Sequence, residues 1–345
     1  MDLPEPSGVD GVAASPPPMG GTLLAGEAGA KIPPPRPLWR SLLKLARPTQ
    51  WAKGAFVVVG PAYALAVGAE VAWIGVAGAV LAFGFAASAC YVINDLKDRE
   101  ADRAHPRKCR RPIASGAVSE RQAVIFAMGL LGASLASVLL AAPGARWWLL
   151  TAVAVYMLNV TIYSLWLKHA AIIDVISLAS GFVLRVLGGC AAAMVVPSSW
   201  LLNCIFFLSM FLAFGKRLGE RRTLGADAAA ARGVQSVYTD DLLRMSVVVT
   251  AVATLITYAG YVQAHEEDYL LGFNLLWLTM LPATYGLLRC IVLLERGEYD
   301  DPTELAGHDR PFQLSVAAFS LITAALIVSR HGAPGVPPLG LVGGG

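Results

Sequence analysis

Asn94, Asp95, Asp98 and Asp102 are spaced so that their side chains could bind a metal ion together. They follow the pattern N-D-x-x-D-x-x-x-D. Residues three, four and seven positions apart share one face of a helix, so the three carboxylates would repel one another unless a cation lay among them. Mg²⁺ prefers oxygen ligands and is usually held by one or two carboxylates together with substrate phosphates. The pattern therefore predicts Mg²⁺ bound to Asp95, Asp98 and Asp102, with Asn94 beside it.

A dense group of basic residues follows these acids. Its members are Arg107, Lys108, Arg110 and Arg111. Such a group can neutralise an anion. A substrate that carries a diphosphate needs both features, because carboxylates alone would repel it and bases alone would not activate its leaving group. The alternative is a solvated helix end, in which the acids pair with Lys97, Arg99 and Arg103.

The elements that must position these residues are membrane helices. Of the 345 residues, 56% are hydrophobic and 15% are charged, against about 25% charged residues in a soluble domain. About nine apolar runs are long enough to cross ~30 Å of hydrocarbon, where the backbone must satisfy its own hydrogen bonds as a helix. We therefore expect an all-α polytopic membrane protein. The runs centre on Val58, Val80, Phe126, Tyr156, Ser180, Phe207, Ala251, Leu281 and Thr323.

Composition also divides the chain. Residues 1–37 are rich in Pro and Gly and predict a disordered N-terminal tail, and residues 331–345 predict a flexible C-terminal tail. Residues 38–330 would form the transmembrane catalytic domain. Nearly all loop Lys and Arg residues lie before the first span or in the second, fourth, sixth and eighth loops. The positive-inside rule then places the N-terminus and these loops, with the acid motif, in the cytoplasm.

Three segments resemble the UbiA superfamily of intramembrane prenyltransferases. They are "NDLKDREAD" (94–102), "RPTQWAKG" (47–54) and "YSLWLKHAAIIDV" (163–175). The resemblance implies nine transmembrane helices around a central cavity that opens to lipid, with Mg²⁺ at two aspartate-rich motifs. The sixth loop departs from this pattern, because "GKRLGER" (215–221) is basic where the second acidic motif would stand. Gly54, after Lys53, departs from the branch of the superfamily described next, in which asparagine is expected at this position. The basic loop favours a substrate with more phosphate than a prenyl diphosphate has.

One branch of the superfamily, the decaprenyl-phosphate phosphoribosyltransferases, is more similar, also over "SVYTDDLLR" (236–244). It implies transfer of 5-phosphoribosyl from 5-phosphoribosyl diphosphate to a polyprenyl phosphate, releasing diphosphate, for cell-wall arabinan synthesis at the bacterial plasma membrane. The resemblance assigns Asn94, Asp95, Asp98 and Asp102 to the metal and diphosphate site. It assigns the cationic clamp for the substrate phosphates to Lys53, Arg110, Arg111, Lys168, Lys216, Arg217 and Arg221.

Two ionisable residues lie within the fifth span. Asp174 and Arg185 are eleven residues apart, about three helical turns, so both could face the cavity and bind substrate. The alternative is a structural pair that fastens two helices. Tyr163, at a helix entry, is either a substrate contact or an anchor at the membrane interface. We expect no nucleic-acid partner, and the sequence leaves homo-oligomerisation open.

Two other functions remain open. A prenyltransferase that moves an isoprenoid from its diphosphate to an aromatic ring would use the same first motif, but the missing second acidic motif argues against it. A transporter would also have polytopic helices with charges inside the membrane. The sequence has no internal repeat, and its charges gather at one membrane face, which disfavours transport.

Overall fold

The computed structural model describes residues 37–66, 68–105, 108–224, 237–264, 269–270, 273–297 and 308–332. The chain divides into two compact units, and the description below concerns the second, Pro37–Gly345. The tails expected at residues 1–37 and 331–345 lie almost entirely outside the described residues, and so does Arg107. Their assignment as tails stays a prediction.

Almost every described element is a helix. The first half contains α1 (Leu38–Ala46), the 3₁₀ helix η1 (Pro48–Gly54), α2 (Ala55–Ala66), α3 (Trp73–Lys97), α4 (Arg99–Ala104), η2 (Lys108–Arg110), α5 (Glu120–Val138), α6 (Pro143–Leu165) and η3 (Leu167–His169). The second half contains α7 (Ile173–Ala193), α8 (Ser199–Leu224), α10 (Asp240–Gln263), η5 (Leu275–Thr279), α11 (Met280–Arg296) and α13 (Arg310–Gly332). A short antiparallel pair, β1 (Tyr269–Leu270) and β2 (Phe273–Asn274), precedes η5.

The expected all-α membrane architecture is confirmed. Among the described residues, seven helical segments are long and apolar enough to cross a membrane. The two other predicted runs fall on α2, which has 12 residues, and on α13, whose fully described part ends at Leu326. All nine predicted centres therefore lie on helices, although the number that span the membrane need not be nine. Long apolar windows identify membrane helices well because hydrocarbon leaves the backbone no other partner.

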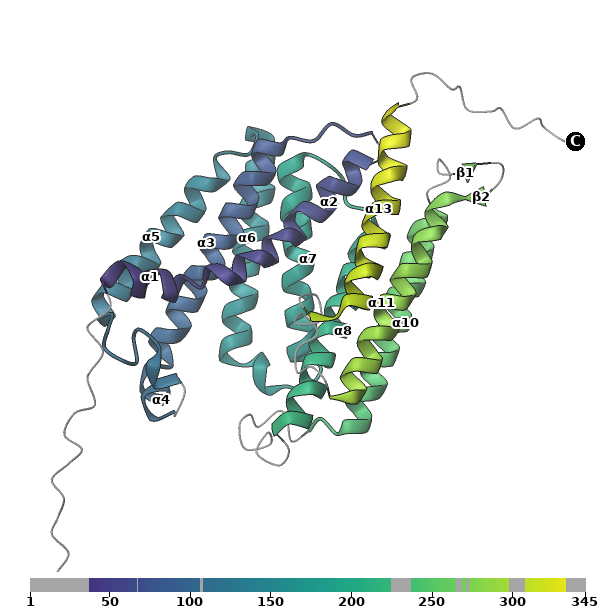
Figure 1. Ribbon diagram of the computed structural model, residues 1–345. Helices are drawn as coiled ribbons and strands as arrows, with labels where there is room; N and C mark the ends of the chain where they lie inside the picture. Colours follow the sequence, from purple (N-terminus) through teal and green to yellow (C-terminus); the bar gives the residue numbers. More distant parts are fainter. Residues whose placement is uncertain are drawn as a thin grey trace, which may run out of the picture. The chain divides into compact units, whose positions relative to one another are not determined.

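Helices that lie close together in the sequence pack against each other. α3 packs on α5 and α6 on α7 in one part, while α8 packs on α10 and α11 on α13 in another (Figure 1). A core around Phe83, Leu149 and Tyr156 lies within the first part. A second core around Phe211, Leu243 and Leu293 lies within the other. α7 contacts both α6 and α8, so it joins the two parts.

Small residues allow α2 to approach α7 closely. A Cβ atom added at Gly189 of α7 would lie 1.8 Å from the carbonyl oxygen of Val57 in α2. In the reverse direction, a Cβ atom at Gly60 of α2 would lie 2.2 Å from Sγ of Cys190. Membrane helices often associate through such residues, since lipid removes the hydrophobic driving force and leaves close packing as the main attraction.

A hydrogen-bond chain fixes the N-terminal segment on α3. Nε1 of Trp51 donates to Oγ of Ser88 at 3.0 Å, and Ser88 donates to the carbonyl oxygen of Ala46 at 2.7 Å. The Trp51 ring also packs edge-on against Phe85. α1 and η1 therefore lie across α3 (Figure 1). The next residue after Ala46 is Arg47, and this attachment directs it toward the end of α3.

Candidate active site

The predicted acids lie where α3 ends. α3 stops at Lys97, Asp98 forms a turn, and α4 begins at Arg99. The backbone N–H of Asp98 still donates to the carbonyl oxygen of Asn94, so the break is slight. Asp95 and Asp102 are buried on either side of it, with 4% and 3% of their surfaces exposed.

Two arginines hold these buried acids, and together the four residues form what we call the acid cluster: Arg47, Asp95, Asp102 and Arg111. Nη1 of Arg111 lies 3.1 Å from Oδ1 of Asp95 and 2.7 Å from Oδ2 of Asp102. Nη2 of Arg47 lies 2.6 Å from the same Asp95 oxygen. One guanidinium nitrogen therefore lies between two carboxylates, so both acids are oriented toward a single positive charge.

Local geometry explains how Arg47 reaches the cluster. Ser88 and Asp95 are seven residues apart in α3 and share a helix face. The hydrogen bond from Ser88 holds the end of α1 over that face. Arg47 itself adopts the left-handed conformation, with φ 52°, which ends α1 and turns the chain into η1. Arg47 opens the motif "RPTQWAKG", but the motif alone does not predict that it contacts the acids.

The remaining acid-motif residues have different surroundings. Oδ1 of Asn94 accepts a hydrogen bond from Oγ of Ser164 at 2.9 Å, which links α3 to the last turn of α6. Asp98 is half-buried and forms no ion pair with any described residue. Within the described ranges, no three His, Cys, Asp or Glu side chains are arranged to hold a metal ion. The three-carboxylate Mg²⁺ site therefore stays a prediction.

A second group, which we call the buried cluster, consists of Asp174, Arg217 and Tyr238. Asp174 is fully buried in the first turn of α7, and Oδ2 forms an ion pair with Nη2 of Arg217 on α8. Its Oδ1 accepts a hydrogen bond from the Tyr238 hydroxyl at 2.7 Å. Asp174 therefore belongs to an ion pair that fastens two helices, α7 and α8, which is the alternative that the sequence left open for it.

Tyr238 completes this cluster from the segment before α10. Its oxygen accepts a hydrogen bond from the backbone N–H of Ile172 at 2.6 Å. Ile172 has φ 69°, a strained conformation for a β-branched residue. Burial, and then the hydrogen bond to Asp174, raise the pKa of Tyr238 above its ordinary value. The hydroxyl therefore stays protonated at neutral pH and remains a donor.

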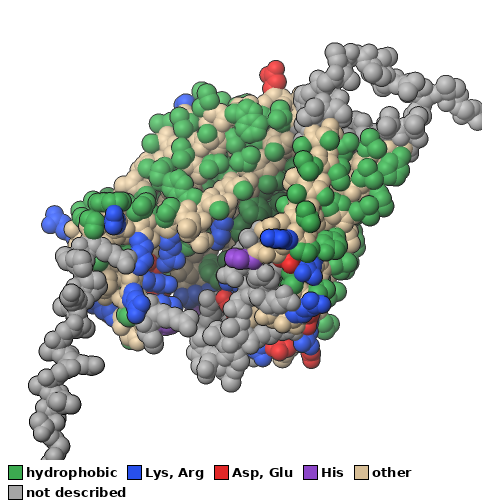
Figure 2. All heavy atoms as spheres, viewed as in Figure 1, with side chains coloured by type: hydrophobic (Ala, Val, Ile, Leu, Met, Phe, Trp, Pro, Cys, Tyr) green, Lys and Arg blue, Asp and Glu red, His purple; other side chains and the backbone are tan. Residues whose placement is uncertain are grey.

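The other predicted substrate contacts surround these clusters. Arg221 on α8 donates to Oδ1 of Asp240 at 2.6 Å, close to Tyr238. Arg110 on η2 and Lys168 on η3 form no ion pair with a described residue. Lys53 is half-buried on η1, Lys216 is exposed on α8 and Tyr163 is half-buried in the last turn of α6. Figure 2 shows Lys and Arg side chains gathered around a hollow on one face of the molecule.

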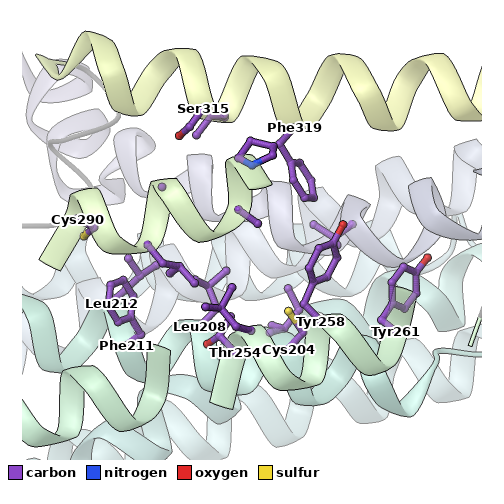
Figure 3. A pocket seen from close by; sticks show the side chains of 18 of the residues that line it. Cys204, Leu208, Phe211, Leu212, Thr254, Tyr258, Tyr261, Cys290, Ser315 and Phe319 are labelled. Atoms are coloured by element: carbon purple, nitrogen blue, oxygen red, sulfur yellow. The ribbon is translucent and has the colours of Figure 1, made fainter. Parts of the chain in front are cut away.

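An apolar cavity of about 410 Å³ lies among α2, α8, α10, α11 and α13. Leu208, Phe211 and Tyr258 line it, and Phe319 covers it from α13 (Figure 3). Spacing along the chain could not indicate this cavity, because its walls come from five helices.

Comparison with known proteins identifies the family. The model of the UbiA prenyltransferase family matches residues 55–328. The chain belongs to this family. The UbiA homolog of Archaeoglobus fulgidus, solved with DMAPP and Mg²⁺, has a TM-score of 0.62 and 18% identity over 84% of this chain and 99% of that one. That likeness establishes a UbiA fold.

Two curated UbiA relatives are closer in sequence. A decaprenyl-phosphate phosphoribosyltransferase of Mycolicibacterium smegmatis is 35% identical over 90% of this chain and all of its own length. Another of that name, from Corynebacterium glutamicum, is 33% identical over 88% of this chain and 92% of its own. The similarity to the phosphoribosyltransferase branch of the UbiA family is confirmed.

Proposed function

We propose that the chain transfers a 5-phosphoribosyl group from 5-phosphoribosyl diphosphate to a polyprenyl phosphate, with decaprenyl phosphate as the model acceptor. The main support for this activity is the 35% sequence identity to a decaprenyl-phosphate phosphoribosyltransferase over the whole length of that relative. The product would be a precursor for cell-wall arabinan. The geometry supports the proposal, because buried carboxylates and many cations meet at one end of a membrane-helix bundle.

The donor needs cations for three phosphate groups. Arg111 and Arg110 follow the acid motif directly, and Lys168 lies on the short connection between α6 and α7. Neither Arg110 nor Lys168 has a carboxylate partner among the described residues, so both retain charge for a phosphate. Lys53 and the α8 residues Lys216 and Arg221 would extend this clamp. Arginine binds phosphate with two parallel hydrogen bonds, which orients the donor as well as attracting it.

The acid cluster has the chemistry to hold Mg²⁺. Asp95 and Asp102 already flank one positive nitrogen, and Asp98 lies nearby without an ion-pair partner among the described residues. One or two carboxylates with substrate phosphate oxygens are a usual ligand set for this ion. Asp95 and Asp102 would hold it, with Asp98 beside them. When bound, Mg²⁺ supplies charge stabilisation for the departing diphosphate.

The residues then act mainly by positioning and electrostatics. The bond between C1 of ribose and the diphosphate oxygen breaks, and the electron pair leaves with diphosphate beside Arg111 and Arg47. C1 becomes oxocarbenium-like, and a phosphate oxygen of the lipid forms the new bond from the opposite face, with inversion. Because the acceptor is already an anion, no general base is needed to create the nucleophile.

The polyprenyl phosphate acceptor is a lipid, so the transfer has to take place at the membrane. The chain is a multi-pass membrane protein, so a lipid can enter the bundle from the side while its head group meets the polar end. The apolar cavity beside Phe211 and Phe319 could receive isoprenoid units (Figure 3). We further propose that the N-terminus and the acid cluster face the cytoplasm, as the positive-inside rule requires.

A direct assay tests the reaction. Purified protein in detergent receives labelled 5-phosphoribosyl diphosphate, decaprenyl phosphate and Mg²⁺, and a labelled lipid is expected. Asp95→Asn should abolish its formation, while Asp241→Asn should not, since the Asp241 side chain is 90% exposed at the start of α10. A prenylated aromatic acid formed from polyprenyl diphosphate, without any labelled lipid, would establish the rival activity instead.

Removal of metal tests the Mg²⁺ assignment separately. Chelation should stop lipid labelling, and added Mg²⁺ should restore it. Titration of Mg²⁺ into protein with bound diphosphate should shift the thermal unfolding midpoint, and Asp95→Asn should remove that shift. Full activity after exhaustive chelation would contradict the assignment without affecting the proposed reaction.

A further inference from the structure

Arg185 is a buried cation in the interior of the helix bundle. It lies in the middle of α7, a candidate membrane span, and only 6% of its surface is exposed. A buried charge is costly unless a partner neutralises it, and ionisable residues inside membrane spans usually serve substrates or ions. Arg185 therefore requires a partner that carries negative charge.

The described residues provide polar contacts for Arg185 but no counter-ion. Nη1 donates to the carbonyl oxygen of Gly181 at 3.0 Å, and Nη2 donates to the Tyr156 hydroxyl at 2.7 Å. The guanidinium also lies 4.4 Å from the centre of the Tyr156 ring and 5.5 Å from that of Phe182. These contacts use two of five N–H groups and leave the positive charge unneutralised by any described carboxylate.

Arg217 provides a comparison within the same protein. It is buried to the same degree, with 5% of its surface exposed, and it forms an ion pair with Asp174. Among the residues that the structure describes, the fold therefore supplies a carboxylate to Arg217 and none to Arg185. This difference indicates that Arg185 is kept for an anion that comes from outside the chain.

The Arg185 side chain extends toward the catalytic end. Its bond to the carbonyl oxygen four residues earlier shows that the guanidinium lies on the N-terminal side of its own Cα atom, the side on which Asp174 lies. Tyr91 packs against the core that contains Tyr156, the hydrogen-bond partner of Arg185, and the Arg47 guanidinium lies 4.8 Å from the centre of the Tyr91 ring. Tyr91 is one helical turn before Asp95 in α3. Arg185 is thus about one turn deeper in the membrane than the acid cluster.

We propose that Arg185, oriented by Tyr156, binds a phosphate monoester group of a substrate inside the bundle. The proposal rests on the proposed function, in which two such groups exist: the phosphate of the lipid acceptor and the 5-phosphate of the ribosyl donor. Both present a dianion to a preorganised guanidinium fork, which has higher affinity for phosphate in a poorly hydrated site. The apolar surroundings and the depth of Arg185 fit the lipid better.

Binding without turnover tests the site and separates the two sources. The thermal unfolding midpoint of purified protein is measured with decaprenyl phosphate, with decaprenol, which lacks the phosphate, and with ribose 5-phosphate. In the wild type, decaprenyl phosphate should raise the midpoint more than decaprenol does. Arg185→Met should remove that difference if the lipid phosphate is bound, or remove the response to ribose 5-phosphate if the donor is bound.

Arg146→Met is the matched control. Like Arg185, Arg146 forms no ion pair with a described residue: it donates to the carbonyl oxygens of Ala141 and Leu139. It lies in the first turn of α6, at the opposite end of this helix from Ser164, which bonds to Asn94. The thermal unfolding midpoint of Arg146→Met should respond to decaprenyl phosphate and to ribose 5-phosphate as that of the wild type does. Arg185→Lys keeps the charge and loses the fork, so it should weaken phosphate binding by about tenfold even if the methionine variant does not fold. Unchanged responses to both phosphates in the Arg185 variants would overturn the proposal.

Kinetic measurements separate the binding role proposed for Arg185 from the proposed phosphoribosyl transfer. If the wild type transfers no phosphoribosyl group, the proposed function fails, but the binding experiment still reports on Arg185. If transfer occurs, Arg185→Lys should raise the KM of one substrate by about tenfold and leave the KM of the other unchanged. An equal fall in kcat with both KM values unchanged would contradict a binding role.

Discussion

Arg111 is the residue on which the acid cluster depends most. One of its nitrogens contacts both Asp95 and Asp102, and its side chain is only 30% exposed. Such an arrangement needs a planar group with fixed N–H directions. Lysine has a point charge on a flexible stem and cannot replace it without losing geometry.

Arg111→Lys is therefore expected to lower kcat/KM by about tenfold or more, because the two acids would lose their shared orientation. The measurement is the rate of labelled lipid formation at varied donor concentration. Arg99→Lys is the control: Arg99 is 29% exposed and pairs with Glu120 and Glu100, which are themselves exposed. Equal losses in both variants would show that position 111 has no special role.

Tyr238 matters for stability as well as for the site. Tyr238→Phe removes one donor to the buried Asp174 and leaves the Ile172 N–H without its acceptor, while Asp174 keeps Arg217 and the Val175 N–H as partners. Such losses destabilise by about 1–3 kcal/mol. We expect a lower thermal unfolding midpoint and lower activity, whereas Tyr285→Phe, at a 49% exposed position, should behave as the wild type. Because the pKa of Tyr238 is raised, activity at mildly alkaline pH should not fall through ionisation of this hydroxyl.

The contact between α2 and α7 shows how elements are positioned. α2 has only 12 residues and contains Pro61, so it depends on its neighbour for support. Gly189 and Gly60 let the two backbones touch, and α7 carries both Asp174 and Arg185. The packing of α2 thus affects the helix that holds the buried charges.

Gly189→Ala should separate the two helices, since the new methyl group would meet the Val57 backbone, which cannot rotate away. Overpacking of this kind costs about 1–3 kcal/mol. The expected result is a lower thermal unfolding midpoint in detergent. Gly129→Ala in α5 is the control, because nothing lies within 4 Å of its added Cβ atom. Similar midpoints for the two variants would disprove the close contact.

Tryptophans mark where the whole protein meets the membrane surface. Trp147 and Trp148 are 75% and 72% exposed at the start of α6, and Trp166 is 67% exposed just after its end. The eighteen α6 residues from Trp148 to Leu165 span about 27 Å, close to the hydrocarbon thickness. Ser164, beside Trp166, bonds to Asn94. The acid cluster therefore lies at the membrane boundary.

The orientation can be tested on intact cells. Ser115, in the second loop, and Val196, in the fifth, are both exposed. Val196→Cys should react with a membrane-impermeant maleimide from outside, while Ser115→Cys should react only after permeabilisation. The wild type, whose cysteines are buried or half-buried, measures the background. The opposite pattern would place the active site outside the cell.

The sequence by itself determined the membrane class, the positions of the helices and the acid motif. These depend on local properties, namely apolar length, periodicity and residue type, which are read along one chain. The quoted motifs also indicated the family, which the comparisons confirmed.

Only the tertiary structure decided which charges pair. From the sequence, Asp174 could either face the cavity or fasten two helices, and in the structure it bonds to Arg217 and Tyr238 across helices. Arg47 reaches Asp95 because Ser88 holds the end of α1. Such pairs depend on the rotation and register of packed helices. Those are set by contacts such as Gly189 on Val57, between residues far apart in the chain, and no local pattern encodes them.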